Sequence, residues 1–446
     1  MSRKFFGTDG IRGAANQVLT ADLALAAGRA AVAVLPAARP RILIGRDTRI
    51  SGPMLEAALI AGISSAGGEP IRAGVIPTPA VASLVIDQNA DAGAVISASH
   101  NPYQDNGIKF FGASGFKLTD EQEVEMERYL TGEERPPVPD DPSAVAYLKN
   151  AYEEYVDHLL ARYNLDISGL RILVDCANGA TYESAPLAFK RLNARATVIA
   201  DRPDGFNIND GCGSTHVHGL RDEVLAGGFD VGLAFDGDGD RVIAIDASGN
   251  VVDGDFIMAI CGNFLKKSGK LPKNTIVTTV MTNLGFHMAM KELGIEVRTT
   301  AVGDRYVLED MLAGGYGFGG EQSGHLINLE TGTTGDGLAT ALLLLQAMTE
   351  TGSSLKELAK VMVRMPQKLV NVRVVDMAGL AKAAGIWEKV EAETIRLGDE
   401  GRVLVRPSGT EPVVRVMVEA TTLELCDDIC AGIVSVVENS LGLAGP

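Results

Sequence analysis

Cysteine is scarce in this chain, and its placement excludes several kinds of site. The 446 residues include five cysteines, and no two of them form a CxxC pair. Scattered thiols disfavour a disulfide framework and a zinc site, and they are typical of reduced thiols in the cytoplasm, where we expect the protein. They are Cys176, Cys212, Cys261, Cys426 and Cys430.

Positive charge and long apolar runs are scarce as well. Lysine and arginine number 40 against 57 acidic residues, which gives a formal net charge of −17. We therefore expect no nucleic acid partner, because a phosphate backbone needs a basic surface. The longest alanine-rich stretch, 21–38, is interrupted by Asp22 and Arg29, so no membrane span is expected. Asp9 and Arg12 likewise interrupt the apolar region that a signal peptide would need.

What the chain has instead is an internal repeat. Three stretches begin with a short apolar run, at 41–45, 171–175 and 275–280, as is typical of strands buried on both faces of a mainly parallel sheet. A second and a third strand follow in each stretch. They are 70–75 and 92–96, 196–200 and 231–235, and 295–300 and 316–319. The repeated order strand, helix, strand, helix, strand predicts three similar α/β domains with mainly parallel mixed sheets.

The tail has a different pattern, which predicts a C-terminal α+β domain with an antiparallel sheet. Three segments alternate as antiparallel strands do, and 423–441 is helical. The strand segments are 370–375, 402–406 and 413–418. A proline-rich acidic connection at 133–143 and a predicted helix over 144–163 separate the first two repeats. We expect domains at 1–150, 151–254, 255–368 and 369–446, in keeping with a chain too long for one core.

The third strand of each repeat runs into a polar loop that contains candidate functional residues. In open α/β sheets, ligands bind beyond the carboxyl ends of the strands, so we expect the three loops to meet in one cleft. The loops are 97–102, 236–241 and 321–325.

The second of these loops predicts a magnesium site. Asp236, Asp238 and Asp240 alternate with glycines directly after a strand. Three carboxylates so close together are unfavourable unless a cation neutralises them, and Mg²⁺ prefers oxygen ligands. An EF-hand is excluded, because its sixth and twelfth positions would be Arg241 and Ala247 instead of Gly and Glu. Arg241 is a candidate contact for a transferring phosphoryl oxygen.

Ser99, in the first loop, is a candidate nucleophile. Its local sequence alone is typical of a turn, and we expect the residue to be exposed. The repeat, however, puts it at a place equivalent to the aspartates, in the neighbouring domain. A phosphorylated Ser99 would carry roughly −1.5 to −2 charges, which Mg²⁺ bound to the aspartates could balance. His100 is its polar neighbour, and no GxSxG motif of a hydrolase is present.

Further candidates for phosphate contacts lie at the two ends of the chain. A turn between two tail strands combines hydroxyls, a glycine and two arginines, which suit phosphate binding, although a plain hairpin with surface arginines is an alternative. Its residues are Arg406, Ser408, Gly409, Thr410 and Arg415. Near the N-terminus, Arg12 follows a glycine-rich segment. Lys109 could transfer a proton if nearby cations lower its pKa, although a surface lysine is an alternative.

Taken in order, these elements resemble the α-D-phosphohexomutase superfamily over essentially the whole chain. The similar segments are Ser99-His100-Asn101-Pro102, 236–241, 321–325 and 406–410. Segments 6–13, 302–307 and 321–325 are also similar to the members that act on glucosamine phosphate. Relatives that act on mannose or glucose phosphates often have a histidine-containing loop where this chain has Asp304-Arg305. No acid or base role is therefore carried over to that position.

The resemblance implies four domains around one cleft and a mutase reaction. Phosphorylated Ser99 would convert glucosamine 6-phosphate into glucosamine 1,6-bisphosphate and then take back the other phosphate, for UDP-N-acetylglucosamine and cell-wall synthesis. Ser99 and the three aspartates would hold Mg²⁺, and the groups around the phosphoryl would be Arg12, His100, Lys109 and Arg241. Glu321 and Ser323 would bind sugar hydroxyls, and the tail turn would bind the second phosphate.

Three other functions compete with this one. The nearest is a mutase of the same superfamily that acts on mannose or glucose phosphates. The others are a phosphosugar-binding protein without catalysis, which would need neither Ser99 nor the aspartates, and a metal-dependent phosphatase. The sequence leaves the oligomeric state open, and a homodimer is one possibility.

Overall fold

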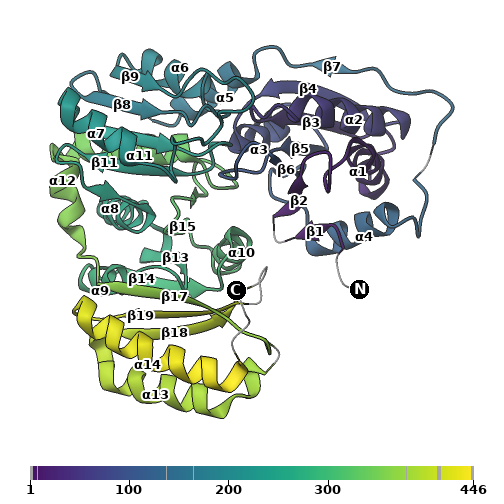
Figure 1. Cartoon of the computed structure of the whole chain (residues 1–446). Coiled ribbons are helices and arrows are strands. Elements are labelled where there is room, and N and C mark those ends of the chain that lie inside the picture. The colour runs from purple at the N-terminus through teal and green to yellow at the C-terminus, as the bar shows by residue number, and fades with distance from the viewer. Residues whose placement is uncertain are drawn as a thin grey trace. The chain divides into compact units, whose positions relative to one another are not determined.

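The computed structural model of the chain describes residues 4–7, 9–136, 138–163, 165–377, 379–408 and 413–442 (Figure 1). The chain divides into two compact units. Unit 1 comprises Met1–Met281 and Gly294–Val361, and unit 2 comprises Thr282–Leu293 and Met362–Pro446.

Unit 1 contains three sheets with the same four-stranded centre. These strands are β3 (Arg41–Arg46), β4 (Glu69–Val75), β5 (Ala92–Ile96) and β6 (Asp105–Gly112); β8 (Arg171–Asp175), β9 (Arg195–Ile199), β10 (Val231–Phe235) and β11 (Val242–Asp246); and β13 (Thr275–Thr279), β14 (Glu296–Thr300), β15 (Phe318–Gly320) and β16 (Leu326–Asn328). The strand orders are β6-β5-β3-β4, β11-β10-β8-β9 and β16-β15-β13-β14. In each centre, three neighbouring strands are parallel, and the strand that comes last in the sequence is antiparallel to its neighbour. The predicted repeat of mainly parallel mixed sheets is confirmed.

Short strands extend two of these sheets, and helices cover their faces. The added strands are β1 (Phe6–Gly7), β2 (Gly10–Ala14), β7 (Ala146–Tyr147) and β12 (Val251–Val252). The helices of unit 1 are α1 (Ala21–Val34), α2 (Gly52–Ser65), α3 (Thr78–Asp87), α4 (Asp120–Leu130), α5 (Ala151–Leu160), α6 (Ser184–Arg191), α7 (His218–Gly227), α8 (Gly254–Lys267), α10 (Asp304–Gly314), α11 (Gly337–Thr351) and α12 (Leu355–Leu358). Ile42 and Ile44, which alternate along β3, pack in one buried cluster with residues of α1 and α2.

The helix predicted over 144–163 is shorter than expected. α5 begins only at Ala151, and the preceding Ala146 and Tyr147 are extended and pair with Ile71 and Arg72 of β4 in parallel. The edge of β4 offers backbone groups that need partners, and this requirement outweighs the helical propensity of the segment.

Unit 2 has an antiparallel sheet of order β17-β19-β18. Its elements are β17 (Gln367–Arg373), β18 (Arg402–Pro407), β19 (Val413–Glu419), α9 (Leu284–Glu292), α13 (Ala384–Leu397) and α14 (Leu423–Leu441). The alternating Val414, Val416 and Val418 pack with α14, so the predicted α+β tail is confirmed. We did not predict α13, whose N-cap Ala383 has no side chain that marks a helix start. Glu419 binds the start of α9 by accepting from the backbone N–H of Leu284 at 3.0 Å.

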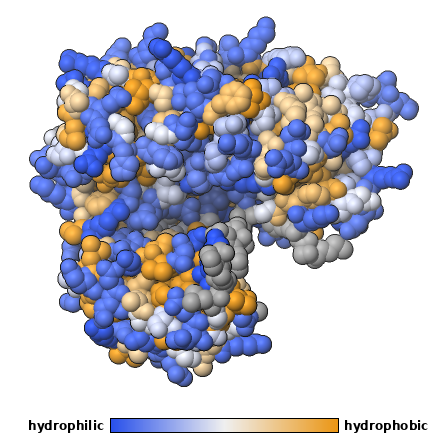
Figure 2. All heavy atoms as spheres, viewed as in Figure 1, coloured by the Kyte–Doolittle hydropathy of each residue, from blue (hydrophilic) through white to orange (hydrophobic). Residues whose placement is uncertain are grey.

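Hydrophilic residues cover most of the visible surface of the chain (Figure 2). Among the described residues, no helix is both long and apolar enough to cross a membrane. Some large apolar side chains, such as those of Ile50 and Phe206, are exposed. Single exposed apolar residues of this kind are normal on folded proteins.

Candidate functional site

Ser99 lies in the loop between β5 and β6, in a strained backbone conformation. Our expectation of an exposed residue was wrong, because only 1% of Ser99 is exposed. Its φ of +52° lies in the left-handed region, which residues other than glycine rarely adopt. Two side chains hold its carbonyl: Asn209 Nδ2 donates to it at 2.9 Å and Arg49 Nη2 at 2.8 Å. The surrounding structure therefore imposes this conformation on Ser99.

Arg49 is the main support of this serine loop. It is fully buried, and its Nε donates to Asp47 at 2.8 Å. The same carboxylate accepts from the Ser97 hydroxyl at 2.6 Å, and Ser97 in turn accepts from the N–H of Ser99 at 2.9 Å. The guanidinium also donates to the carbonyls of Ser99, Asn101, Pro102 and Asp105. Arg49 and Asp47 were not predicted from the sequence, because their contacts with the serine loop join segments about fifty residues apart.

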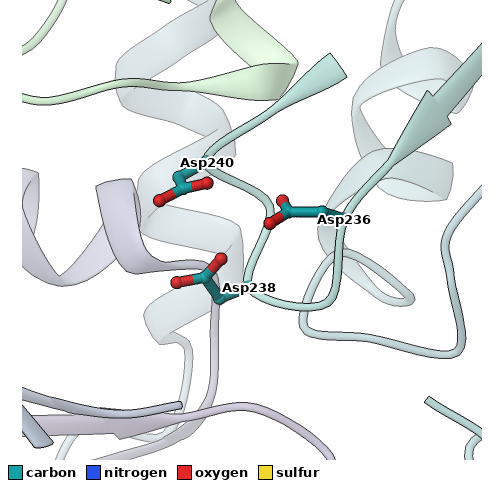
Figure 3. A group of neighbouring side chains, drawn as sticks. All are labelled: Asp236, Asp238 and Asp240. Atoms are coloured by element: carbon teal, nitrogen blue, oxygen red, sulfur yellow. The ribbon is translucent and has the colours of Figure 1, made fainter. Parts of the chain in front are cut away.

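The aspartate loop, residues 236–240, connects β10 to β11, and its three carboxyl groups converge (Figure 3). One oxygen from each of Asp236, Asp238 and Asp240 lies within 4.8 Å of the others, and all three residues are buried. Oδ1 of Asp238 and Oδ1 of Asp240 find no hydrogen-bond donor within the described part of the chain. Buried carboxylate oxygens left without donors suit a hard divalent cation.

The serine loop and the aspartate loop are in direct contact. The Ser99 hydroxyl donates to Oδ2 of Asp236 at 2.6 Å. A Cβ atom at Gly237 would lie 2.5 Å from the Ser99 carbonyl oxygen, so only glycine fits there. The repeat thus brings a hydroxyl from the first sheet and carboxylates from the second to one point.

The electrostatics of the aspartate loop also suit a cation. Burial and the neighbouring Asp240 and Asp238 raise the pKa of Asp236 well above its usual range. Burial alone would also raise the pKa of Asp240, but His325, Lys109 and Arg241 outweigh it and lower that pKa. One acid of the group therefore resists ionisation, and a bound divalent cation would remove this resistance.

Lys109 lies on β6 beside the aspartates. We expected it to transfer a proton if nearby cations lowered its pKa, and this condition was wrong. Burial would lower its pKa, yet the surrounding carboxylates outweigh burial and raise it. Lys109 Nζ lies 3.0 Å from Asp9, 3.3 Å from Asp238 and 3.8 Å from Asp240. It is a fixed cation here, suited to neutralising charge and not to accepting a proton.

The other predicted groups around Ser99 are His100, Arg12 and Arg241. Burial, followed by the charges of Arg241 and Arg12, lowers the pKa of His100 to about 4, so its ring is neutral at pH 7. His100 Nδ1 is 3.2 Å from the Ser99 hydroxyl. Arg12 pairs with Asp9. The buried Nε atoms of Arg12 and Arg241 have no acceptor among the residues described.

The third loop joins the same site through His325, which we had given no role. Glu321 accepts from the Gly303 N–H at 3.2 Å, and the buried Ser323 hydroxyl has no partner in the described ranges. His325 Nδ1 lies 3.4 Å from Asp240, and Nε2 lies 3.7 Å from Asp304. Burial would lower the pKa of His325, but these acids raise it to about 9. Its place in an equivalent loop was the signal that we did not use.

The predicted phosphate turn lies in unit 2, where two arginines face each other. Arg406 of β18 is the cross-strand neighbour of Arg415 of β19. Burial and the charge of Arg415 lower the pKa of Arg406. The Ser408 N–H donates to the Val413 carbonyl at 2.8 Å, whereas Gly409 and Thr410 lie outside the described residues. An anion bound beside two like charges would offset their repulsion.

The chain matches four family profiles in succession. They are described as phosphoglucomutase/phosphomannomutase alpha/beta/alpha domain I, over residues 3–136, domain II, over 153–249, domain III, over 253–365, and the C-terminal domain, over 369–436. Together these matches span most of the chain.

Curated relatives and solved structures are similar to the chain over nearly its full length. Phosphoglucosamine mutase of Oceanobacillus iheyensis is 52% identical over 443 residues, covering 98% of this chain and 99% of the relative. That of Moorella thermoacetica is 52% identical, covering 96% and 98%. A phosphoglucomutase/phosphomannomutase family protein of Burkholderia thailandensis has a TM-score of 0.83 at 22% identity, covering 100% of this chain and 99% of its own. Aspergillus fumigatus N-acetylphosphoglucosamine mutase, in complex with GlcNAc-6P and magnesium, has a TM-score of 0.70 at 18% identity, covering 98% and 96%.

Proposed function

This chain belongs to the phosphoglucomutase/phosphomannomutase family, and we propose that within it the chain is an isomerase that interconverts glucosamine 6-phosphate and glucosamine 1-phosphate. The relatives about half identical to it are named phosphoglucosamine mutase. The observation that carries the chemistry is the contact of 2.6 Å between the Ser99 hydroxyl and Asp236. We propose the cytoplasm as its location and UDP-N-acetylglucosamine synthesis as the use of its product.

The proposed reaction has two phosphoryl transfers at Ser99. In the first, the bond from phosphorus to Ser99 Oγ breaks, a bond from phosphorus to O1 of glucosamine 6-phosphate forms, and the sugar hydroxyl proton is passed to Ser99. The second transfer reverses these steps at O6 of glucosamine 1,6-bisphosphate and leaves glucosamine 1-phosphate. We propose that His100, neutral at rest, passes the moving proton on through Nδ1, which its distance of 3.2 Å from Ser99 Oγ supports.

Mg²⁺ would be held by Asp236, Asp238, Asp240 and Ser99, and it would supply charge stabilisation to the transferring phosphoryl group. The carboxylate oxygens of Asp238 and Asp240 that lack a donor among the described residues, and the raised pKa of Asp236, support this proposal. Arg12, Lys109 and Arg241 supply further positive charge on the protein side.

The remaining groups are proposed to orient the sugar and its second phosphate. Glu321 and Ser323 would bind sugar hydroxyls, which the buried and unpartnered Ser323 Oγ supports within the described ranges. Arg406, Ser408, Gly409, Thr410 and Arg415 would bind the phosphate that does not react, and the facing arginines support this role. Water must be kept from the phosphoserine, because its hydrolysis would end the cycle.

A substrate comparison tests the function. Purified full-length protein with Mg²⁺ and a trace of hexose 1,6-bisphosphate is assayed on glucosamine 6-phosphate, mannose 6-phosphate and glucose 6-phosphate, with release of inorganic phosphate followed in parallel. We expect the highest kcat/KM for glucosamine 6-phosphate and little free phosphate. Preference for mannose or glucose phosphate, or release of phosphate at the rate of substrate loss, would contradict the proposal.

The domain boundaries of the chain, its lack of nucleic acid binding and its assembly are further proposals. We propose domains at 1–150, 151–254, 255–368 and 369–446, and limited proteolysis tests these boundaries. The net charge of −17 supports the absence of nucleic acid binding. Light scattering would show whether the protein is a homodimer.

A further inference from the structure

The start of α3 contacts the aspartate loop from the first repeat. Thr78 is the first residue of α3, and 1% of it is exposed. Its hydroxyl donates to Oδ2 of Asp238 at 2.6 Å, and its backbone N–H donates to the Asp238 carbonyl at 2.9 Å. The two residues are 160 positions apart and fall in different family domains.

The hydroxyl bond holds the Asp238 carboxylate, and the N–H bond holds the Asp238 backbone. Oδ2 accepts from both Thr78 and Lys109, the latter at 3.3 Å. Oδ1 receives no hydrogen bond from the described residues, and Asp238 is one of the three aspartates whose carboxyl groups converge. If the hydroxyl were absent, rotation of the carboxylate would no longer be opposed from this side.

The neighbouring backbone makes the contact rigid. A Cβ atom at Gly239 would lie 3.2 Å from Pro77 Cβ and 2.6 Å from the γ-methyl of Thr181, so the tip of the aspartate loop is packed between the two repeats. Thr78 is also the first residue of a ten-residue helix, so the N-terminus of this helix lies at the aspartate loop.

We propose that Thr78 is a positioning residue for the cation, which acts by holding Asp238 with Oδ1 turned toward the metal. The inference rests on the magnesium site of the proposed function. Groups that orient metal ligands in this way typically change metal affinity by about 10- to 100-fold when they are removed.

The test compares Thr78→Val, which keeps the shape and removes the hydroxyl, with Thr78→Ser, which keeps the hydroxyl. Binding of Mn²⁺ to metal-stripped full-length protein is measured by electron paramagnetic resonance, and Mg²⁺ is then added as a competitor. We expect Thr78→Val to bind both ions about tenfold more weakly or worse, and Thr78→Ser to bind like the wild type. Turnover of Thr78→Val should recover as Mg²⁺ is raised.

Thr181→Val is the matched control. Thr181 is equally buried beside the same loop, but its hydroxyl faces the Cys176 carbonyl at 3.5 Å and not an aspartate. Unchanged affinity in Thr78→Val, equal losses in Thr78→Val and Thr78→Ser, or an equal loss in Thr181→Val would each overturn the proposal. If Thr78→Val does not fold, Thr78→Cys, a weaker donor of similar size, takes its place under the same criteria. Wild-type protein that binds neither ion would instead refute the magnesium site, and the inference with it.

Discussion

The aspartate loop and the facing arginines of the tail are both clusters of like charge, but they differ in burial. Each aspartate of the loop is at most 5% exposed. Arg406 and Arg415 are only partly buried, on a two-stranded hairpin. A buried charge must be balanced inside the protein or by a bound ion, whereas a half-exposed charge can be screened by water.

Because the two clusters differ in burial, we expect them to have different roles. Around the aspartates, Lys109, His325 and Arg241 already supply part of the counter-charge, and we propose that this loop holds the metal of the reaction. The arginine hairpin is proposed to bind the phosphate that does not react. Changes in the first cluster should therefore alter turnover, and changes in the second should alter substrate affinity.

The largest expected effect is that of Ser99→Ala. Turnover should fall by at least about a thousandfold, because the proposed nucleophile is lost. The free energy of unfolding should fall by only about 1 kcal/mol, through the lost hydrogen bond to Asp236. Steady-state rates with added bisphosphate measure the turnover, and urea unfolding measures the free energy of unfolding. Ser65→Ala, in the same domain, is the control. A variant that keeps more than a tenth of the wild-type rate would remove Ser99 from the mechanism.

Metal removal should come next in size. EDTA should stop turnover, Mg²⁺ should restore it, and Asp238→Asn should lower kcat by about a hundredfold or more, because a metal supplies several kcal/mol of charge stabilisation. The control is Asp246→Asn, a buried aspartate whose carboxylate accepts from Ser248 and Asn250 in a turn. Full activity after exhaustive chelation would refute the magnesium site.

His325 should make the stability of the apo protein depend on pH. Its pKa is raised to about 9, so the protonated ring stabilises the fold below pH 6.5, and this contribution is lost as the pH rises through 9. The loss should reach about 3 kcal/mol, since one pKa unit is worth 1.4 kcal/mol. Urea unfolding in EDTA at pH 6 and pH 10 should show this fall in the wild type and in the exposed control His216→Gln. A fall of equal size in His325→Gln would show that the ring is not its source.

The smallest effect on turnover is expected for Arg415→Ala. The KM for glucosamine 6-phosphate should rise by about 30- to 150-fold, the equivalent of 2–3 kcal/mol for a charge-assisted contact, and bisphosphate should escape into solution. The variant should nevertheless be slightly more stable, by about 0.5 kcal/mol, because two like charges no longer face each other. Unchanged KM and unchanged bisphosphate release would make Arg415 an ordinary surface residue.

The sequence was most informative where local pattern decides structure. The strands of the three repeats and the helix 423–441 could be predicted, because short apolar runs and a 3.6-residue period are local signals. The start of α5 could not, because pairing of Ala146 with β4 is a tertiary effect. The helix α13 lacks a cap that would mark its start.

The candidate site shows the same division. Ser99 and the three aspartates stand out by residue type and by their equivalent places in the repeat. Arg49, Asn209, Thr78 and His325 do not, because each acts through a partner that only folding brings near. The burial of Ser99 was missed for the same reason, since its covering residues come from two different repeats.

The left-handed backbone of Ser99 sets stability against activity at a single position. A serine in this conformation carries a conformational cost of about 1–2 kcal/mol that a glycine would not. Directed evolution that selected only for heat resistance would therefore have a reason to accept glycine here, and the proposed nucleophile would be lost with the serine. On the proposed mechanism, a serine persists at residue 99 because selection acts on the reaction as well as on the fold.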